Sequence, residues 1–196
     1  MIIDNQLKNK KYLKIIQSKD ISVYDCPKCR AKASMIRHAY YERNVISIID
    51  EVMLFSTLKI LRVKCKSCDS THAILPGDII PYKQFDYLSF IAILENYFYF
   101  DQSGYKLSSK FNVSFQTIYS FINTFLIFKD STFVTLRVMA TVENLFSRKP
   151  SKLIQYIKNE IGFINFMDHF QSINHWPFLM TKFQTVVTPY IFIGFQ

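Results

Sequence analysis

The spacing of hydrophobic and polar residues changes along this chain of 196 residues, from alternation before about residue 75 to helical spacing after residue 82. Between residues 58 and 66, apolar positions alternate with Arg62, Lys64 and Lys66, which is the pattern of a strand with one buried face. Val45–Ile49 is a second apolar and β-branched run, and Asp50-Glu51 predicts a turn between the two strands. Residues 21–75 are therefore expected to form a small antiparallel β-structure.

Segments with apolar residues at helical spacing follow a predicted turn or linker at Leu75-Pro76-Gly77-Asp78. The breaker Asp101-Gln102-Ser103-Gly104 separates the first two of these segments. The final stretch, Trp176–Gln196, is apolar and aromatic with little charge, and its pattern predicts no definite element. The expected helices are Lys83–Phe100, Tyr105–Phe111, Ser114–Phe125, Ser131 to about Phe146, and Pro150 to about Phe170.

The net charge of +9 is concentrated near the N-terminus, since residues 1–70 carry +7, residues 71–130 carry −1 and residues 131–196 carry +3. Such a basic excess favours a polyanionic partner. Residues 1–20 are predicted as a short helix or arm, which is either a solvated basic tail or an arm that binds nucleic acid. Its basic residues include Lys8, Lys10, Lys11 and Lys14.

Several function classes lack their sequence signals. The chain has only 4 glycines and no Gly-rich phosphate-binding motif. No apolar segment follows a basic start, and Phe85–Phe100 is too short and too polar for a membrane span. No catalytic constellation or small-molecule site is evident. We therefore expect a cytoplasmic protein that is not an enzyme and that has no membrane partner.

The four cysteines form two CxxC pairs, Cys26 with Cys29 and Cys65 with Cys68. A gap of two residues lets one tight turn present two thiolates to one ion, and two such turns complete a tetrahedral zinc site. The shell of four thiolates leaves no open position, so one structural Zn²⁺ is predicted. The 35 residues between the pairs would form a long β-hairpin or a three-stranded insert. A redox pair or an iron centre are the alternatives, and His38 and His72 are possible substitute ligands.

Residues 104–121 fit a helix-turn-helix, in which two helices pack at a steep angle across a short turn. Leu107, Phe111 and Ile118 would lie between the helices. Asn112 tolerates the left-handed conformation that the turn needs, and Ser114 would cap the second helix. A plain helical hairpin without a DNA-binding role is the alternative.

The outward face of the second helix would contact DNA. Gln116 and Asn123 would recognise base edges, and Ser114 and Ser120 would hold phosphates. Tyr119 lies on the same face, whereas Phe115 occupies a position where a polar residue would be more useful. The remaining predicted phosphate contacts are Lys106 and Lys110 on the preceding helix and Arg62, Lys64 and Lys66 on the ribbon.

These motifs resemble a bacterial family with a four-cysteine zinc ribbon and a helix-turn-helix, similar to the N-terminal DNA-binding region of insertion-sequence transposases. The resemblance spans roughly residues 20–130 and rests on three segments: CPKC at 26–29, LRVKCKSCDSTHAILPGDIIPY at 61–82, and the helix-turn-helix at 104–125. It implies binding of element-end or promoter DNA, with zinc on the four cysteines. Transposases of this kind continue into a catalytic domain with three metal-binding carboxylates. The carboxylates after residue 130 are Glu143, Glu160 and Asp168, and we interpret them as charges on helix surfaces.

The sequence thus predicts an α+β chain: a basic N-terminal arm or helix at 1–20, a four-cysteine zinc ribbon at 21–75, an all-helical helix-turn-helix domain at 82–130, and a helical C-terminal region of unknown role at 131–196. The first functional hypothesis is a zinc-dependent protein that binds double-stranded DNA as a transposase-related accessory factor or transcriptional regulator. The alternatives are a protein–protein adaptor and a non-catalytic transposase fragment, whose partner would be a second copy or a transposase chain.

Overall fold

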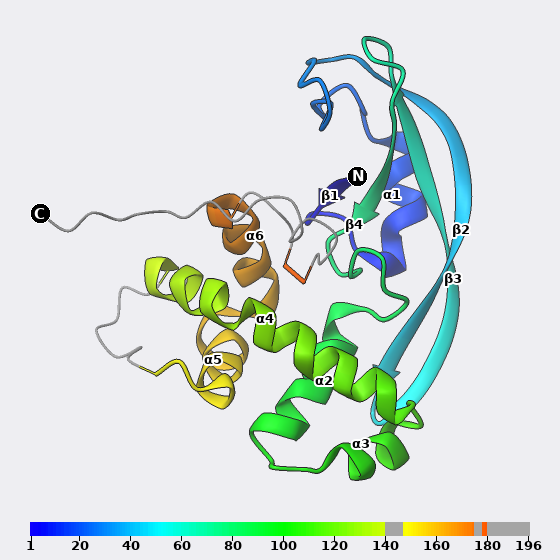
Figure 1. The fold of residues 1–196 in the computed structure, drawn as a ribbon. Coiled ribbons are helices and arrows are strands. Elements are labelled where there is room, and N and C mark those ends of the chain that lie inside the picture. Colours follow the sequence, from blue (N-terminus) through cyan, green and yellow to red (C-terminus); the bar gives the residue numbers. More distant parts are fainter. Residues whose placement is uncertain (140–146, 175–177, 180–196) are drawn as a thin grey trace, which may run out of the picture.

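One long β-hairpin connects the two ends of the molecule (Figure 1). It consists of β2 (Met35–Ile49) and β3 (Val52–Cys65), paired antiparallel from Met35↔Cys65 to Ile49↔Val52. The turn falls at Asp50-Glu51, as predicted, and both residues have positive φ, 48° and 67°. A two-residue turn of this kind matches the right-handed twist of the strands. At about 3.3 Å per residue, β3 extends roughly 43 Å.

The computed structural model describes residues 1–139, 147–174 and 178–179.

The hairpin is part of a four-stranded sheet with the order β1-β4-β3-β2. β4 (Thr71–Pro76) pairs antiparallel with β3 only near the cysteine end, at Arg62–Lys64. β1 (Ile2–Asp4) pairs parallel with β4 and forms the far edge. The sheet is therefore four strands wide near the cysteines and only two strands wide toward the hairpin tip.

The first twenty residues belong to this sheet and its cover. After β1 come a 3₁₀ turn (Asn9–Lys11) and the helix α1 (Tyr12–Ser18), which contacts β3. Tyr12 is completely buried, and its hydroxyl donates a hydrogen bond to the carbonyl of Ile74 (2.7 Å) and accepts one from the amide of Leu61 (3.0 Å). The predicted helix is present, but the segment packs into the sheet and is not an extended arm, because its apolar residues complete the core.

The helices after residue 86 differ from the prediction in two places. The expected third helix and the start of the fourth form one continuous helix, because residues 115–139 contain no Gly or Pro to interrupt it. The expected fifth helix is interrupted at Gly162, whose φ is 77°. Residues 140–146 of the expected fourth helix lie outside the described residues, as does Trp176–Gln196 apart from Phe178 and Leu179. The observed helices are α2 (Tyr87–Phe98), α3 (Gly104–Phe111), α4 (Phe115–Met139), α5 (Pro150–Tyr156), a π-helical turn (Ile157–Ile161) and α6 (Phe163–Asn174).

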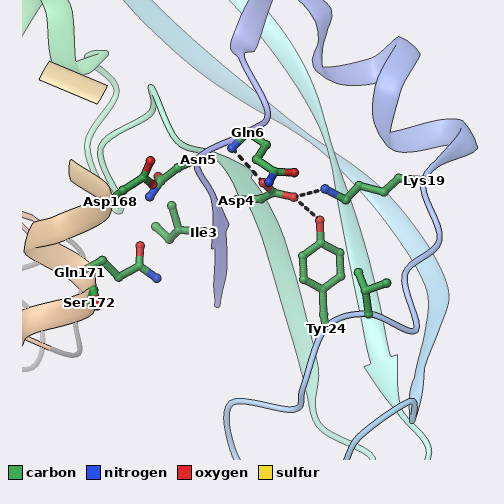
Figure 2. A pocket seen from close by; sticks show the side chains of 10 residues that line it. Ile3, Asp4, Asn5, Gln6, Lys19, Tyr24, Asp168, Gln171 and Ser172 are labelled. Atoms are coloured by element: carbon green, nitrogen blue, oxygen red, sulfur yellow. Dashed lines mark hydrogen bonds and ion pairs between the residues drawn. The ribbon is translucent and has the colours of Figure 1, made fainter. Parts of the chain in front are cut away.

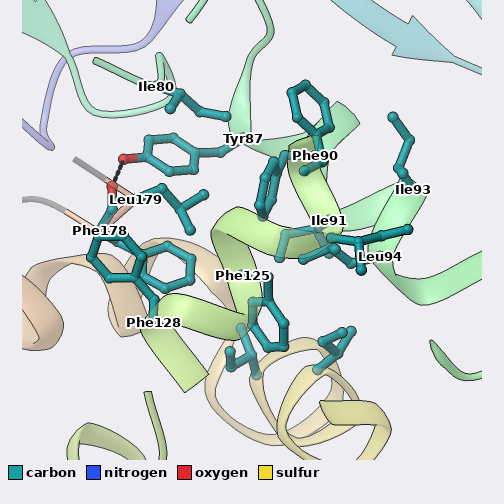
Figure 3. Close-up of a cluster of buried hydrophobic side chains, with 14 of the residues drawn as sticks. Ile80, Tyr87, Phe90, Ile91, Ile93, Leu94, Phe125, Phe128, Phe178 and Leu179 are labelled. Carbon is teal, nitrogen blue, oxygen red and sulfur yellow. Dashed lines mark hydrogen bonds between the residues drawn. The ribbon is translucent and has the colours of Figure 1, made fainter. Parts of the chain in front are cut away.

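The hairpin contributes side chains to two hydrophobic cores. One lies between the sheet and α1 and includes Cys26 and Cys65, and the other lies among the helices (Figure 3). Val45 faces the first core and its neighbour Ile46 faces the second, since adjacent side chains of a strand point to opposite sides. In the helical core, the hydroxyl of Tyr87 donates a hydrogen bond of 2.6 Å to the carbonyl of Phe178.

Hydrogen bonds also attach the start of α2 directly to β2. The amide of Ile46 donates to the carbonyl of Gln84 (2.8 Å), and the amide of Asp86 donates to the carbonyl of Ile46 (3.1 Å). The Asp86 carboxylate caps α2 by accepting from the amide of Ser89 (2.8 Å), and it also accepts from the hydroxyl of Ser47 (2.5 Å). The expected organisation, a ribbon followed by a separate all-helical domain, is therefore not what the structure shows: the ribbon's own strand is part of the helical core.

Candidate functional site

The four cysteines converge at one end of the hairpin. Their sulfur atoms all lie within 4.8 Å of one another, with 3.6 Å between Sγ of Cys26 and Cys68 and 3.7 Å between Sγ of Cys29 and Cys65. A tetrahedron of thiolates at about 2.3 Å from a zinc ion has edges of about 3.8 Å, whereas a disulfide would need about 2.05 Å. The arrangement fits a metal ion held by four thiolates. Within the described residues, it is the one group of three or more side chains placed to hold a metal.

The two cysteine loops repeat the same backbone geometry. In the first, the amide of Arg30 donates to the carbonyl of Cys26 (2.8 Å), and in the second the amide of Asp69 donates to the carbonyl of Cys65 (3.0 Å). Arg30 and Asp69 both have left-handed φ values, 60° and 56°. The repeated turn explains why the CxxC spacing alone was sufficient to find all four residues: each pair is built by local hydrogen bonds.

Metal binding requires the thiolate form of a cysteine, and a polar neighbour favours that form at Cys65. The Ser34 hydroxyl lies 3.3 Å from Sγ of Cys65, and this hydrogen bond lowers the pKa of the Cys65 thiol. His72 lies with Nε2 3.4 Å from Sγ of Cys26. His72, one of the two possible substitute ligands, is half-buried on β4 beside the cluster, whereas the other, His38, is an exposed residue of β2. Four cysteines complete a tetrahedral shell, so His72 is placed to donate a hydrogen bond to a thiolate.

The predicted basic face of the ribbon is partly engaged within the molecule. Arg62 is exposed and lies over the ring of Tyr41, with 5.0 Å from its guanidinium carbon to the ring centroid. Lys64 forms an ion pair of 2.8 Å with Asp69, while Lys66 is exposed and takes part in none of the ion pairs of the described residues. Arg62 and Lys66 are therefore more available to an anionic partner than Lys64.

The helix pair α3 and α4 has the left-handed turn residue, the capping serine and the buried residues that were predicted within residues 104–121. Asn112 ends α3 in the left-handed conformation (φ 51°, ψ 40°), and its amide donates to the carbonyl of Ser108. Ser114 precedes α4, and its hydroxyl oxygen accepts a hydrogen bond of 3.2 Å from the amide of Thr117. Leu107, Phe111 and Ile118 are buried between the helices. Side-chain capping and the left-handed turn residue set this geometry locally.

The first turns of α4 present a row of exposed polar side chains. Gln116, Ser120 and Asn123 are exposed, and within the described part of the chain their side chains make no hydrogen bond, so all three are free to contact a ligand. Lys106 on α3 is also exposed. Lys110 was predicted to contact phosphate, but in the structure it contacts other residues of the protein. It forms an ion pair of 2.8 Å with Glu51 at the hairpin tip and donates a 3.1 Å hydrogen bond to Asn96.

An aromatic stack beside this row was not predicted. The ring centroids of Tyr105 and Phe115 are 4.5 Å apart with an interplanar angle of 29°, and Phe115 and Tyr119 are also 4.5 Å apart. Phe115 is thus explained as the middle ring of a stack. Gly104 is the residue in the sequence that could have indicated the close approach of these rings. A residue with a Cβ could not replace it without a shift, since that Cβ would lie 2.5 Å from Cε2 of Tyr119. In the sequence, Gly104 indicates only the end of the breaker before this helix.

The structure also contains an open polar cavity of about 690 Å³, where the sequence had indicated no small-molecule site (Figure 2). It lies between the chain around Asp4 and one face of α6, which contributes Asp168, Gln171 and Ser172. Asp4 is buried and forms an ion pair of 2.5 Å with Lys19. Burial opposes ionisation of Asp4, but the hydrogen bonds from Lys19 and Tyr24 outweigh it and lower the pKa of this carboxyl.

The predicted surface carboxylates agree with the structure where it describes them. Glu160 and Asp168 are exposed, whereas Glu143 lies outside the described residues. Among the helices of the described ranges, none has the length and apolar character needed to cross a membrane.

One part of the chain is similar to a known family model. Residues 26–106 match the model of a domain of unknown function, DUF6431, which covers both cysteine pairs, the hairpin, α2 and the start of α3. Neither the curated proteins nor the solved structures contain a match. The comparisons therefore show a match to a domain of unknown function over the residues that include the four cysteines, and its activity has to be argued from the geometry.

Proposed function

We propose that this protein binds double-stranded DNA through α3 and α4, with one structural zinc ion on Cys26, Cys29, Cys65 and Cys68 stabilising the base of the hairpin. The observation that carries the proposal is the free polar row on the first turns of α4, presented by a capped helix after a tight left-handed turn. In a helix-turn-helix this is the part of the second helix that enters the major groove.

The residue types in this row suit base recognition. Gln116 and Asn123 carry amides that can donate and accept together at the edge of adenine. Lys106, and Arg62 and Lys66 on the ribbon, supply positive charge for phosphates, in keeping with the net charge of +9. We infer the role of a transposase-related accessory factor or a transcriptional regulator, without catalysis by this chain.

Zinc is the proposed metal because four thiolates at tetrahedral separations are its usual structural ligand set. When bound, the ion would fix the two cysteine loops against each other. Cys26 and Cys65 are buried in the sheet core, so the metal centre and the packing around β3 are expected to stabilise each other. We expect one zinc per chain, and a Cys65→Ser variant should lose the metal and melt at a lower temperature.

The DNA proposal is tested by selecting sites from randomised duplex DNA, with the zinc content measured on the same sample and the affinity measured across salt concentrations. We expect an enriched motif and an affinity that falls steeply with salt. Gln116→Ala and Asn123→Ala should each weaken binding to the selected site by about 5- to 100-fold and binding to random DNA far less. Asn159→Ala, an exposed amide on the π-helical turn, is the matched control and should change neither.

A protein–protein adaptor is the second candidate, because the hairpin tip exposes apolar side chains. Val52, Leu54 and Phe55 are exposed, with Phe55 at 72%. If selection enriches no DNA sequence and DNA binding is absent at low salt, the DNA proposal is wrong. Binding of a protein partner that is insensitive to salt and is lost in Phe55→Ser would then support the adaptor.

A further inference from the structure

The stack of Tyr105, Phe115 and Tyr119 has one open end. Tyr105 is 73% exposed, and the ring contact with Phe115 is the one ring contact it makes among the described residues. At the other end, Tyr119 contacts Tyr97, with ring centroids 6.4 Å apart. The outer face of Tyr105 is therefore exposed at one end of the row of rings, and Tyr97 packs against the other end.

The local backbone holds this row in place. Tyr105 lies in the first turn of α3, which Ser103 caps by accepting a hydrogen bond from the amide of Lys106. Phe115 is the first residue of α4, so the short turn at residues 112–114 fixes the two rings relative to each other. Gly104 lets Tyr119 approach the backbone of α3 more closely than any other residue would permit. Binding of a flat ligand would cost these side chains little conformational entropy, because the rings already lie in a fixed arrangement.

The surroundings indicate what kind of flat ligand fits. Lys106 is the next residue and is exposed, with no ion pair among the described residues. Gln116, which we propose to contact bases, follows Phe115 directly. A ligand here would thus offer an aromatic face and a nearby negative charge, and it would be continuous with the DNA on α4. A nucleobase with its phosphate has both properties, and every base has a π-face that stacks on aromatic side chains.

We propose that Tyr105 stacks on an unpaired base of the bound DNA, so that the protein prefers sites with an extruded or single-stranded nucleotide beside the duplex. Within a duplex, a paired base has both faces covered by its neighbours, so at an interior position an unpaired base is needed to extend the row of rings. This inference rests on the proposed DNA-binding function and specifies the form of DNA that the same surface recognises.

The test uses the chain of 196 residues and the duplex selected above, resynthesised as a series with a single unpaired 2-aminopurine at successive positions. At one position we expect affinity at least about fivefold above that of the fully paired duplex, with quenching of the 2-aminopurine fluorescence. Tyr105→Ala should abolish both the preference and the quenching, while Tyr105→Phe, which keeps the ring, should retain them. Tyr40→Ala removes an exposed tyrosine from β2 and is the matched control.

The outcomes separate this inference from the DNA-binding proposal. If the protein binds the paired duplex and no unpaired position improves affinity, the inference is wrong and the proposed function stands. If replacing thymine by uracil in the paired site weakens binding in a Tyr105-dependent manner, the rings contact thymine methyl groups and the unpaired-base model is again wrong. If no DNA is bound in any form, both proposals fail.

Discussion

Gly104→Ala is a test of the aromatic stack by stability alone. The substitution would normally stabilise a helix, since Ala exceeds Gly in helix propensity by up to about 1 kcal/mol. Here, however, the new Cβ would lie 2.5 Å from Cε2 of Tyr119 and 3.2 Å from Cε2 of Phe115. The first distance is impossible, so the Tyr119 ring must move outward. The sign of the effect depends on what that movement costs.

The cost follows from the contacts that Tyr119 would lose. Its ring lies 4.5 Å from Phe115 and 6.4 Å from Tyr97, and such aromatic pairs each contribute about 0.5–1.5 kcal/mol. Loss of both would cost about 1–3 kcal/mol, which exceeds the propensity gain. We expect Gly104→Ala to lower the free energy of unfolding by roughly 1 kcal/mol, equivalent to about 2–4 °C in Tm for a chain of this size.

A double-mutant cycle makes the reasoning refutable. Urea unfolding followed by circular dichroism would be measured for Gly104→Ala, Tyr119→Ala and the double variant. Without the Tyr119 ring the main clash is gone, so Gly104→Ala should be neutral or stabilising in that background. If Gly104→Ala stabilises the otherwise unchanged protein, or if its cost is undiminished without Tyr119, the clash does not govern this position.

Two further predictions concern the sheet end of the molecule. Tyr12→Phe leaves the amide of Leu61 and the carbonyl of Ile74 buried without their partner, so the free energy of unfolding should fall by about 1–3 kcal/mol in denaturant titration, and an unchanged value would contradict the bridging role. Asp4→Asn should also destabilise the protein at neutral pH, by about 1–3 kcal/mol. Because the folded protein lowers the pKa of Asp4, the stability that this carboxylate contributes is present above its ordinary pKa of 3.8 and is lost as the pH falls through the lower folded value. The difference between Asp4→Asn and the unchanged protein should therefore shrink below about pH 3.8, and a difference that persists there would refute the ion-pair explanation.

Features that depend on neighbouring residues could be predicted from the amino-acid sequence. Both CxxC loops were located because their hydrogen bonds join residues four apart, as between Cys26 and Arg30. The hairpin turn at Asp50-Glu51 and the left-handed Asn112 followed from the chemistry of turns. The cap at Ser114 followed in the same way, since a serine hydroxyl can accept from an amide three residues on.

The way in which these local elements combine depends on contacts between distant residues. Val45 and Ile46 lie in different cores, and no local pattern shows which element covers each face of a strand. The length of α4 was underestimated: residues 115–139 contain no Gly or Pro to interrupt the helix, and the structure adds packing of Phe128 against Phe170 of α6. His72 lies beside Cys26 although 46 positions separate them in the sequence. The need for a glycine at position 104 arises from the close rings of Phe115 and Tyr119 on α4. Contacts between distant residues depend on the whole packed arrangement, which hydrophobic periodicity does not specify.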